Sequence, residues 1–164
     1  MIEAIVVINN AGLPVFHCKS SNVSWNEEMF SAFLSAMESF IEWAWKDERL
    51  FYIKLGEKQI FLSRDKKASL GYTLVASSSV PDEIADRCLV EFRLAFEKFF
   101  PKIIEFNGIV DEGIPASFLR STQRFMEHWN LKLLQNTPTL KKNDPNSFYE
   151  YEGLQKSEIN LCMK

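Results

Sequence analysis

The fold is decided by the stretch from Met1 to Phe16, which reads MIEAIVVINNAGLPVF. Six of the seven residues from Ile2 to Ile8 are apolar, so both faces of an extended strand would carry apolar side chains here. A strand that is apolar on both faces needs cover on both faces. The stretch therefore predicts a fully buried strand near the centre of a sheet.

A tight turn and a second strand follow the first strand. The run from Asn9 to Gly12 holds residue types that tolerate positive φ in a hairpin turn, and extended structure is expected again from Leu13 to Phe16. Because Pro14 has no N–H to donate to a strand ladder, the second strand is expected at an edge of the sheet.

Length and charge limit the class of protein. The chain has 164 residues, 46% of them hydrophobic, and no break in composition, so we expect one domain over residues 1–134 and a tail over 135–164. A net charge of -3 lacks the basic excess that a nucleic-acid partner requires. The first apolar run is too short for a signal peptide or a membrane span. We expect a cytoplasmic protein that reaches membranes only through protein partners.

The sequence carries no signature of a catalytic, cofactor or metal site. Its three cysteines, Cys18, Cys88 and Cys162, are far apart, and there are only two histidines, so neither a disulfide framework nor a zinc site is expected. His17 and Cys18 would point to opposite faces of a strand. Phosphate-loop, dinucleotide, metalloprotease and serine-hydrolase motifs are all absent. The chain is therefore predicted not to be an enzyme.

The hydrophobic period changes to that of a helix after residue 24. Ser24 and Glu27 have the spacing of a capping box, and a helix of about five turns is expected beyond them. Trp43 and Trp45 would lie at the two margins of its buried face, where they either flank the core, which we favour, or sit half-exposed at a contact. The apolar residues of that predicted face are Met29, Phe30, Phe33, Leu34, Met37, Phe40, Ile41 and Ala44.

Three strands and two helices are expected in the rest of the domain. The strands span Leu50 to Leu55, Gln59 to Ser63 and Ser69 to Ala76, and their short connections predict an antiparallel meander. The last of them is apolar at most positions and should be central. A helix start follows from Ser77 to Glu83, with hydroxyl caps, a proline in the first turn and acidic residues.

The second helix should bury a face that runs from Ile84 to Phe100, with Cys88 as an inert core thiol. Pro101 should kink or end this helix, and Asn107-Gly108 is a clear stop. Val90 and Leu94 fall on the opposite side of this helix. We expect the next helix to cover them, and exposure to a partner is the alternative.

A final helix should open near Pro115, because apolar residues recur at helical spacing from Phe118 to Leu133. Beyond Leu134 no sustained apolar period remains. The tail is expected to be mobile except where Phe148, Tyr149 and Tyr151 dock as an aromatic patch.

The expected order is ββαβββαα, which predicts an α/β protein of the α+β type. Its five-stranded antiparallel sheet would pair the apolar first and fifth strands in the middle and carry helices on both faces. Over residues 1–134 the chain resembles the longin domain, a profilin-like unit. The opening from Met1 to Ile5, together with Asn9 and Gly12, is similar to the start of small adaptor subunits.

The longin resemblance implies a function in protein binding. Longin domains occur in trafficking SNAREs, in adaptor subunits and in complexes that regulate GTPases, and they have no catalytic signature. The resemblance thus implies a scaffold or subunit without cofactor that binds small GTPases or other longin or roadblock chains, as a homodimer or heterodimer. The candidate partner-binding residues are Val90, Leu94, Trp43, Phe148, Tyr149 and Tyr151.

A small-ligand sensor of the PAS or GAF type is the alternative. A pocket between sheet and helices with convergent polar groups would favour a sensor. A filled core with an exposed strand edge or an apolar helix patch would favour an interaction module.

Overall fold

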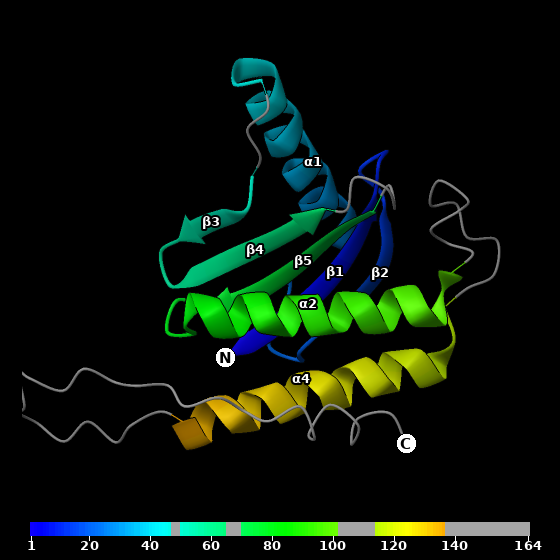
Figure 1. Cartoon of the computed structure of the whole chain (residues 1–164), viewed down its shortest axis with the longest axis vertical. Helices are drawn as coiled ribbons and strands as arrows, with labels where there is room; N and C mark the ends of the chain where they lie inside the picture. The colour runs from blue at the N-terminus through cyan, green and yellow to red at the C-terminus, as the bar shows by residue number, and fades with distance from the viewer. Residues whose placement is uncertain (47–49, 65–69, 102–113, 137–164) are drawn as a thin grey trace, which may run out of the picture.

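The computed structural model describes residues 1–46, 50–64, 70–101 and 114–136. In this part of the chain a five-stranded antiparallel sheet carries helices on both faces (Figure 1), as the sequence predicts. The strands are β1 (Ile2–Asn9), β2 (Pro14–Lys19), β3 (Tyr52–Leu55), β4 (Lys58–Arg64) and β5 (Leu70–Ser77). The helices are α1 (Glu27–Ala44), α2 (Asp82–Phe99) and α4 (Ala116–Asn136).

The strand order β2-β1-β5-β4-β3 confirms the predicted centre and the predicted edge of the sheet. β1 pairs antiparallel with β2 on one side and with β5 on the other. Every residue of β1 from Ala4 to Asn9 is buried. The predicted turn is also present, since Gly12 has a φ of 78° and Asn9 Oδ1 accepts hydrogen bonds from the N–H groups of Ala11 and Leu13, each at 2.9 Å.

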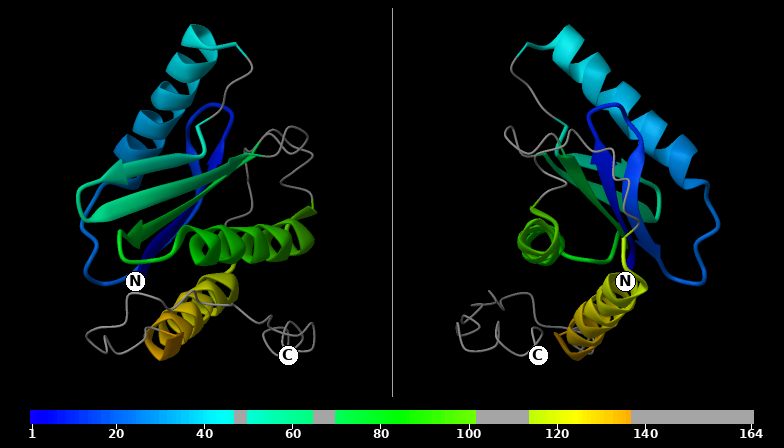
Figure 2. Two further views of the ribbon diagram at one scale, coloured as in Figure 1. Left: turned by 60° about the vertical axis from the view of Figure 1, so that its left-hand side comes forward. Right: turned by 90° about the vertical axis from the view of Figure 1, so that its right-hand side faces the viewer.

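The larger part of the core lies between the sheet and the pair α2 and α4 (Figure 2). Its centre is aromatic: the Phe16 ring of β2 lies 5.9 Å from the Phe92 and Phe96 rings of α2 and 5.4 Å from the Phe118 ring of α4. Cys88 is buried here, as predicted, and its burial raises the thiol pKa well above the ordinary value. This layer is therefore filled by rings that pack edge to face and in stacks.

α1 covers the opposite face of the sheet with a smaller cluster. Leu34 packs there against residues of β1, β4 and β5, which include Val6, Ile60 and Val75. Leu34 and Ser31 are the only fully buried residues of α1. The helix is thus attached to the sheet through a narrow contact.

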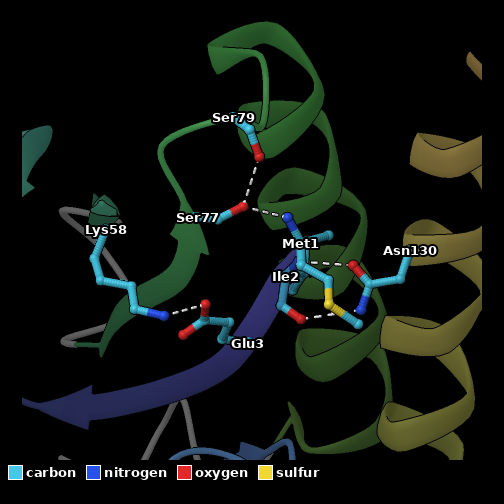
Figure 3. A network of polar contacts seen from close by, with 7 residues as sticks. All are labelled: Met1, Ile2, Glu3, Lys58, Ser77, Ser79 and Asn130. Atoms are coloured by element: carbon cyan, nitrogen blue, oxygen red, sulfur yellow. Dashed lines mark hydrogen bonds and ion pairs between the residues drawn. The ribbon is translucent and has the colours of Figure 1, made fainter. Parts of the chain in front are cut away.

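α4 is tied to the beginning of β1 by one side chain (Figure 3). Asn130 Oδ1 accepts a hydrogen bond from the Ile2 N–H at 2.6 Å, and Asn130 Nδ2 donates one to the Ile2 C=O at 3.0 Å. Beside it, the Met1 amino group contacts the Ser77 hydroxyl, and Glu3 pairs with Lys58. These contacts join the start of β1, the end of β5 and α4 at one corner of the molecule.

The helix caps differ from the predicted ones. α1 is capped by Asn26 and not by Ser24, because Asn26 Oδ1 accepts the Met29 N–H at 2.8 Å from an extended backbone conformation. α2 has Pro81 itself at its N-cap, where a serine hydroxyl was predicted, and no side-chain cap hydrogen bond. The hydroxyl of Ser77 instead lies 2.9 Å from that of Ser79. The first-turn acids, the end of α2 before Pro101 and the start of α4 beyond Pro115 agree with the predictions.

Candidate protein-binding surfaces

α1 presents an apolar stripe to solvent. We define the α1 stripe as Met29, Phe33, Ala36, Phe40 and Trp43, all of which are exposed. Trp43 keeps 80% of its surface accessible. The prediction that Met29, Phe33 and Phe40 belong to the buried face is therefore wrong. Apolar residues occupy most of the circumference of this helix, and the sheet covers only the side that carries Leu34.

The spacing of the α1 stripe is that of a helix-packing seam. Its members follow one another at intervals of four, three, four and three residues, the repeat of a coiled coil. At 3.6 residues per turn, these positions share one side of the helix, while Leu34 lies roughly opposite. α1 therefore has two apolar sides, one on the sheet and one in solvent.

The stripe ends in an aromatic cluster. The Phe40 ring lies 6.2 Å from that of Trp43 and 6.1 Å from that of Trp45, and all three side chains are exposed. Figure 1 shows this end of α1 reaching past the strands. The preferred interpretation of the two tryptophans as flanks of the core is wrong, because the sheet does not extend beneath them.

A second surface lies at the edge strand β3. A groove of about 400 Å³ runs between this edge and the start of α2. We define the β3 groove by its lining residues: Phe51, Tyr52, Phe61 and Leu62 from the strand region, and Asp82, Glu83 and Asp86 from α2. One wall is thus aromatic and apolar, and the other is acidic.

A third surface is the outer side of α2. Val90 is 43% exposed and Leu94 is 60% exposed, so the expectation that the next helix covers them is wrong. α4 packs through Phe118 and Trp129 into the core layer instead. Val90 and Leu94 lie on a helix on the opposite side of the sheet from Trp43, and the structure does not bring these predicted site residues together. Phe148, Tyr149 and Tyr151 lie outside the described residues.

The described residues hold no candidate metal cluster, and burial raises the pKa of both described thiols, Cys18 and Cys88. The β3 groove opens at the sheet edge, whereas rings fill the layer between the sheet and α2. Across residues 1–46, 50–64, 70–101 and 114–136, no group of three or more His, Cys, Asp or Glu side chains could hold a metal ion. In the same ranges, no helix is long and apolar enough to cross a membrane. Cys18 is buried, and burial raises its pKa to about 11, while His17 is exposed on the other face of β2.

Of the α1 stripe, the sequence predicted only Trp43 as a partner-binding residue, and it did not predict the β3 groove. The four-three spacing of the stripe is visible in the sequence, but the same residue types at that spacing also suit a buried face. The groove has no local signal, because one wall comes from the β3 and β4 region and the other from α2, and β5 separates them in the sequence.

No protein-family model and no curated protein matches the sequence. Among solved structures, the chain is similar to a roadblock/LC7 domain from Streptomyces avermitilis, with a TM-score of 0.49 and 10% identity over 61% of this chain and 86% of that one. It is also similar to MglB in a tetrameric arrangement, with a TM-score of 0.39 and 10% identity over 78% of this chain and 79% of that one. At this identity the similarities concern the arrangement of the backbone alone.

Proposed function

We propose that this chain is a non-enzymatic protein-interaction subunit that uses the α1 stripe to pack against a helix of another longin-fold or roadblock-fold chain. The observation that carries the proposal is the exposed stripe itself. Full burial of an exposed large apolar side chain contributes about 1.5–3 kcal/mol. Phe33, Phe40 and Trp43 are 44%, 53% and 80% exposed, so covering this remaining surface favours association. A coiled-coil spacing suits a partner helix that crosses at about 20°.

The stripe is symmetric enough to pair with a second copy of itself. Met29 and Trp43 lie seven residues on either side of Ala36, and Phe33 and Phe40 lie three and four residues from it. An antiparallel pair of α1 helices with a twofold axis at Ala36 would place Met29 of one protomer against Trp43 of its partner. The small Ala36 side chain lets the two helices approach closely, and sulfur contacts with aromatic rings are favourable.

The experiment compares the mass in solution of the full chain with that of a double variant, Phe33→Glu with Phe40→Glu. We expect the unaltered chain to form a dimer of twice 19.0 kDa at micromolar concentration and the double variant to be a monomer with an unchanged circular dichroism spectrum. Ser39→Glu adds a charge on the same helix outside the stripe and should leave the dimer intact. Light scattering after size exclusion provides the mass.

If the chain is a monomer in solution, the proposal is tested with other longin-fold and roadblock-fold chains. Coexpression with longin-fold and roadblock-fold chains should then yield a complex that the double variant loses and Ser39→Glu keeps. If neither self-association nor such a complex depends on the stripe, the proposal is wrong.

The setting of the proposed subunit follows from the longin resemblance. We place it in the cytoplasm, in assemblies that serve membrane traffic or regulate small GTPases. Val90 and Leu94 stay accessible when α1 is occupied, because α2, which carries them, lies on the other face of the sheet from α1 (Figure 2). They are the surface we assign to a small GTPase in such an assembly.

The sensor alternative has less support. Its pocket should lie between the sheet and the helices, where Phe16, Phe92 and Phe118 already pack against one another. The groove at β3 is instead a surface feature beside an open strand edge.

A further inference from the structure

We propose that the β3 groove, together with the open edge of β3, binds an extended basic segment of a partner protein. The segment would pair with β3 as an added strand and place alternate Lys or Arg side chains in the groove. This site lies apart from the α1 stripe and has a different partner chemistry, so the proposed function can fail without affecting it.

The backbone of β3 is oriented to accept another strand. Leu62 N–H donates to the Phe51 C=O at 2.9 Å, and in the register of the pair Ile53 lies opposite Ile60. Residues in an antiparallel pair alternate between those that exchange hydrogen bonds with their partner and those that face away. The N–H and C=O groups of Tyr52 and Lys54 therefore point to the open edge, where no strand lies among the described residues.

The two faces of an added strand would meet different surroundings. The Tyr52 ring lies 5.1 Å from that of Phe61, and its hydroxyl donates to Gln59 Oε1 at 3.1 Å, which places it on the α2 side of the sheet. Ile53 packs with the cluster on the α1 side. Because side chains alternate along a strand, every second residue of the segment would enter the β3 groove. The others would lie beside Ile53 and the exposed Leu55.

The charge of the groove selects a basic segment. Asp82, Glu83 and Asp86 are exposed along one wall, and no ion pair of theirs is found within the described part of the chain. The opposite wall offers the rings of Phe51 and Tyr52. A Lys or Arg side chain between these walls would gain both carboxylate contacts and an aromatic face, whereas an acidic side chain would be repelled. Lys54 lies outside the lining.

The geometry thus defines a sequence preference. An octapeptide that alternates Arg and Val presents cations to the groove and apolar side chains to the α1 side. The same peptide with Glu in place of Arg keeps its strand propensity and reverses the charge. A third peptide, N-methylated on the residues that pair with β3, keeps its charge and loses the backbone donors.

The experiment measures fluorescence anisotropy of these labelled peptides with the full chain. We expect the Arg peptide to bind, and the Glu and N-methylated peptides to bind at least ten times more weakly. Asp86→Lys should lower the affinity for the Arg peptide at least tenfold. Glu127→Lys makes the same charge change on the exposed side of α4 and should alter the affinity less than twofold.

Two more variants test the contributions of the aromatic wall and of the α1 stripe to peptide binding. Phe51→Ser should lower the affinity for the Arg peptide several-fold without a change in the charge of the protein. The double variant Phe33→Glu with Phe40→Glu should bind the Arg peptide as tightly as the unaltered chain does. Melting curves establish that each variant is folded.

Three results would overturn the proposal. Equal effects of Asp86→Lys and Glu127→Lys would show that binding depends on the overall charge of the protein and not on the groove. Equal binding of the N-methylated peptide would exclude strand addition. A several-fold gain in affinity with Lys141→Glu and Lys142→Glu would mean that the chain's own tail, and not a partner, occupies the groove.

Discussion

Asn130 provides Ile2 with the hydrogen bonds that a neighbouring strand residue would provide elsewhere. Its side-chain amide has one acceptor and one donor, and both engage the backbone of Ile2. Ile2 is buried and both hydrogen bonds are partly buried, so its N–H and C=O have little access to water if the amide is removed. Asn130 thereby adds a polar contact to the packing of Phe118 and Trp129, which also holds α4 against the sheet.

Asn130→Ala should lower the free energy of unfolding by about 1–3 kcal/mol, because a buried donor and a buried acceptor lose their partners. Gln123→Ala, at an exposed position of the same helix, should change it by less than about 0.5 kcal/mol. Urea unfolding followed by tryptophan fluorescence measures both. Equal values for the two variants would show that the amide contacts contribute nothing to stability.

At the scale of the element, the two long helices α1 and α2 differ in how far the sequence determines their orientation. α2 carries charged residues, such as Arg87 and Glu91, on the side that faces solvent, and its buried residues Cys88, Leu89 and Phe92 could be predicted. α1 is apolar on two sides, and periodicity alone does not say which side meets the sheet. Whether Val90 and Leu94 are exposed depends on where α4 packs, and the local sequence does not determine the position of α4.

The exposed position of Leu94 predicts a sharp contrast within α2. Leu94→Lys should shift the melting temperature by no more than about 2 °C, since surface substitutions change stability by about 0.5 kcal/mol or less. Leu89→Lys, five residues earlier on the buried side, should unfold the domain because it places a charge in the core. A large loss of stability with Leu94→Lys would show that another part of the molecule covers this position.

For the whole molecule, the sheet was the most predictable part. β1 and β5 are apolar on both faces, and this alone places them in the middle, while Pro14 places β2 at an edge. The β3 groove could not be predicted, because it forms only where the end of the sheet meets the first turns of α2. Surfaces assembled from distant segments depend on tertiary packing, which a single sequence does not display.

The strand order predicts a gradient of hydrogen exchange across the sheet. Amides of β1 and β5 should exchange only through global unfolding, because both strands are buried and paired on two sides. Amides of the short edge strand β3 should exchange through local opening and at least a hundred times faster. Mass spectrometry of fragments from a dilute, monomeric sample resolves this gradient. Protection of β3 equal to that of β1 would contradict the assignment of β3 as an open edge.

The hydrogen bonds between Ile2 and Asn130 join positions 128 residues apart. A ribosome that adds about 5–20 residues per second makes Asn130 roughly 6–25 s after Ile2. During this interval the nascent β1, which is apolar on both faces, lacks first its partner strand β5 and then α4. Chaperones that hold unpaired apolar strands should therefore contact this chain early in its synthesis and release it late.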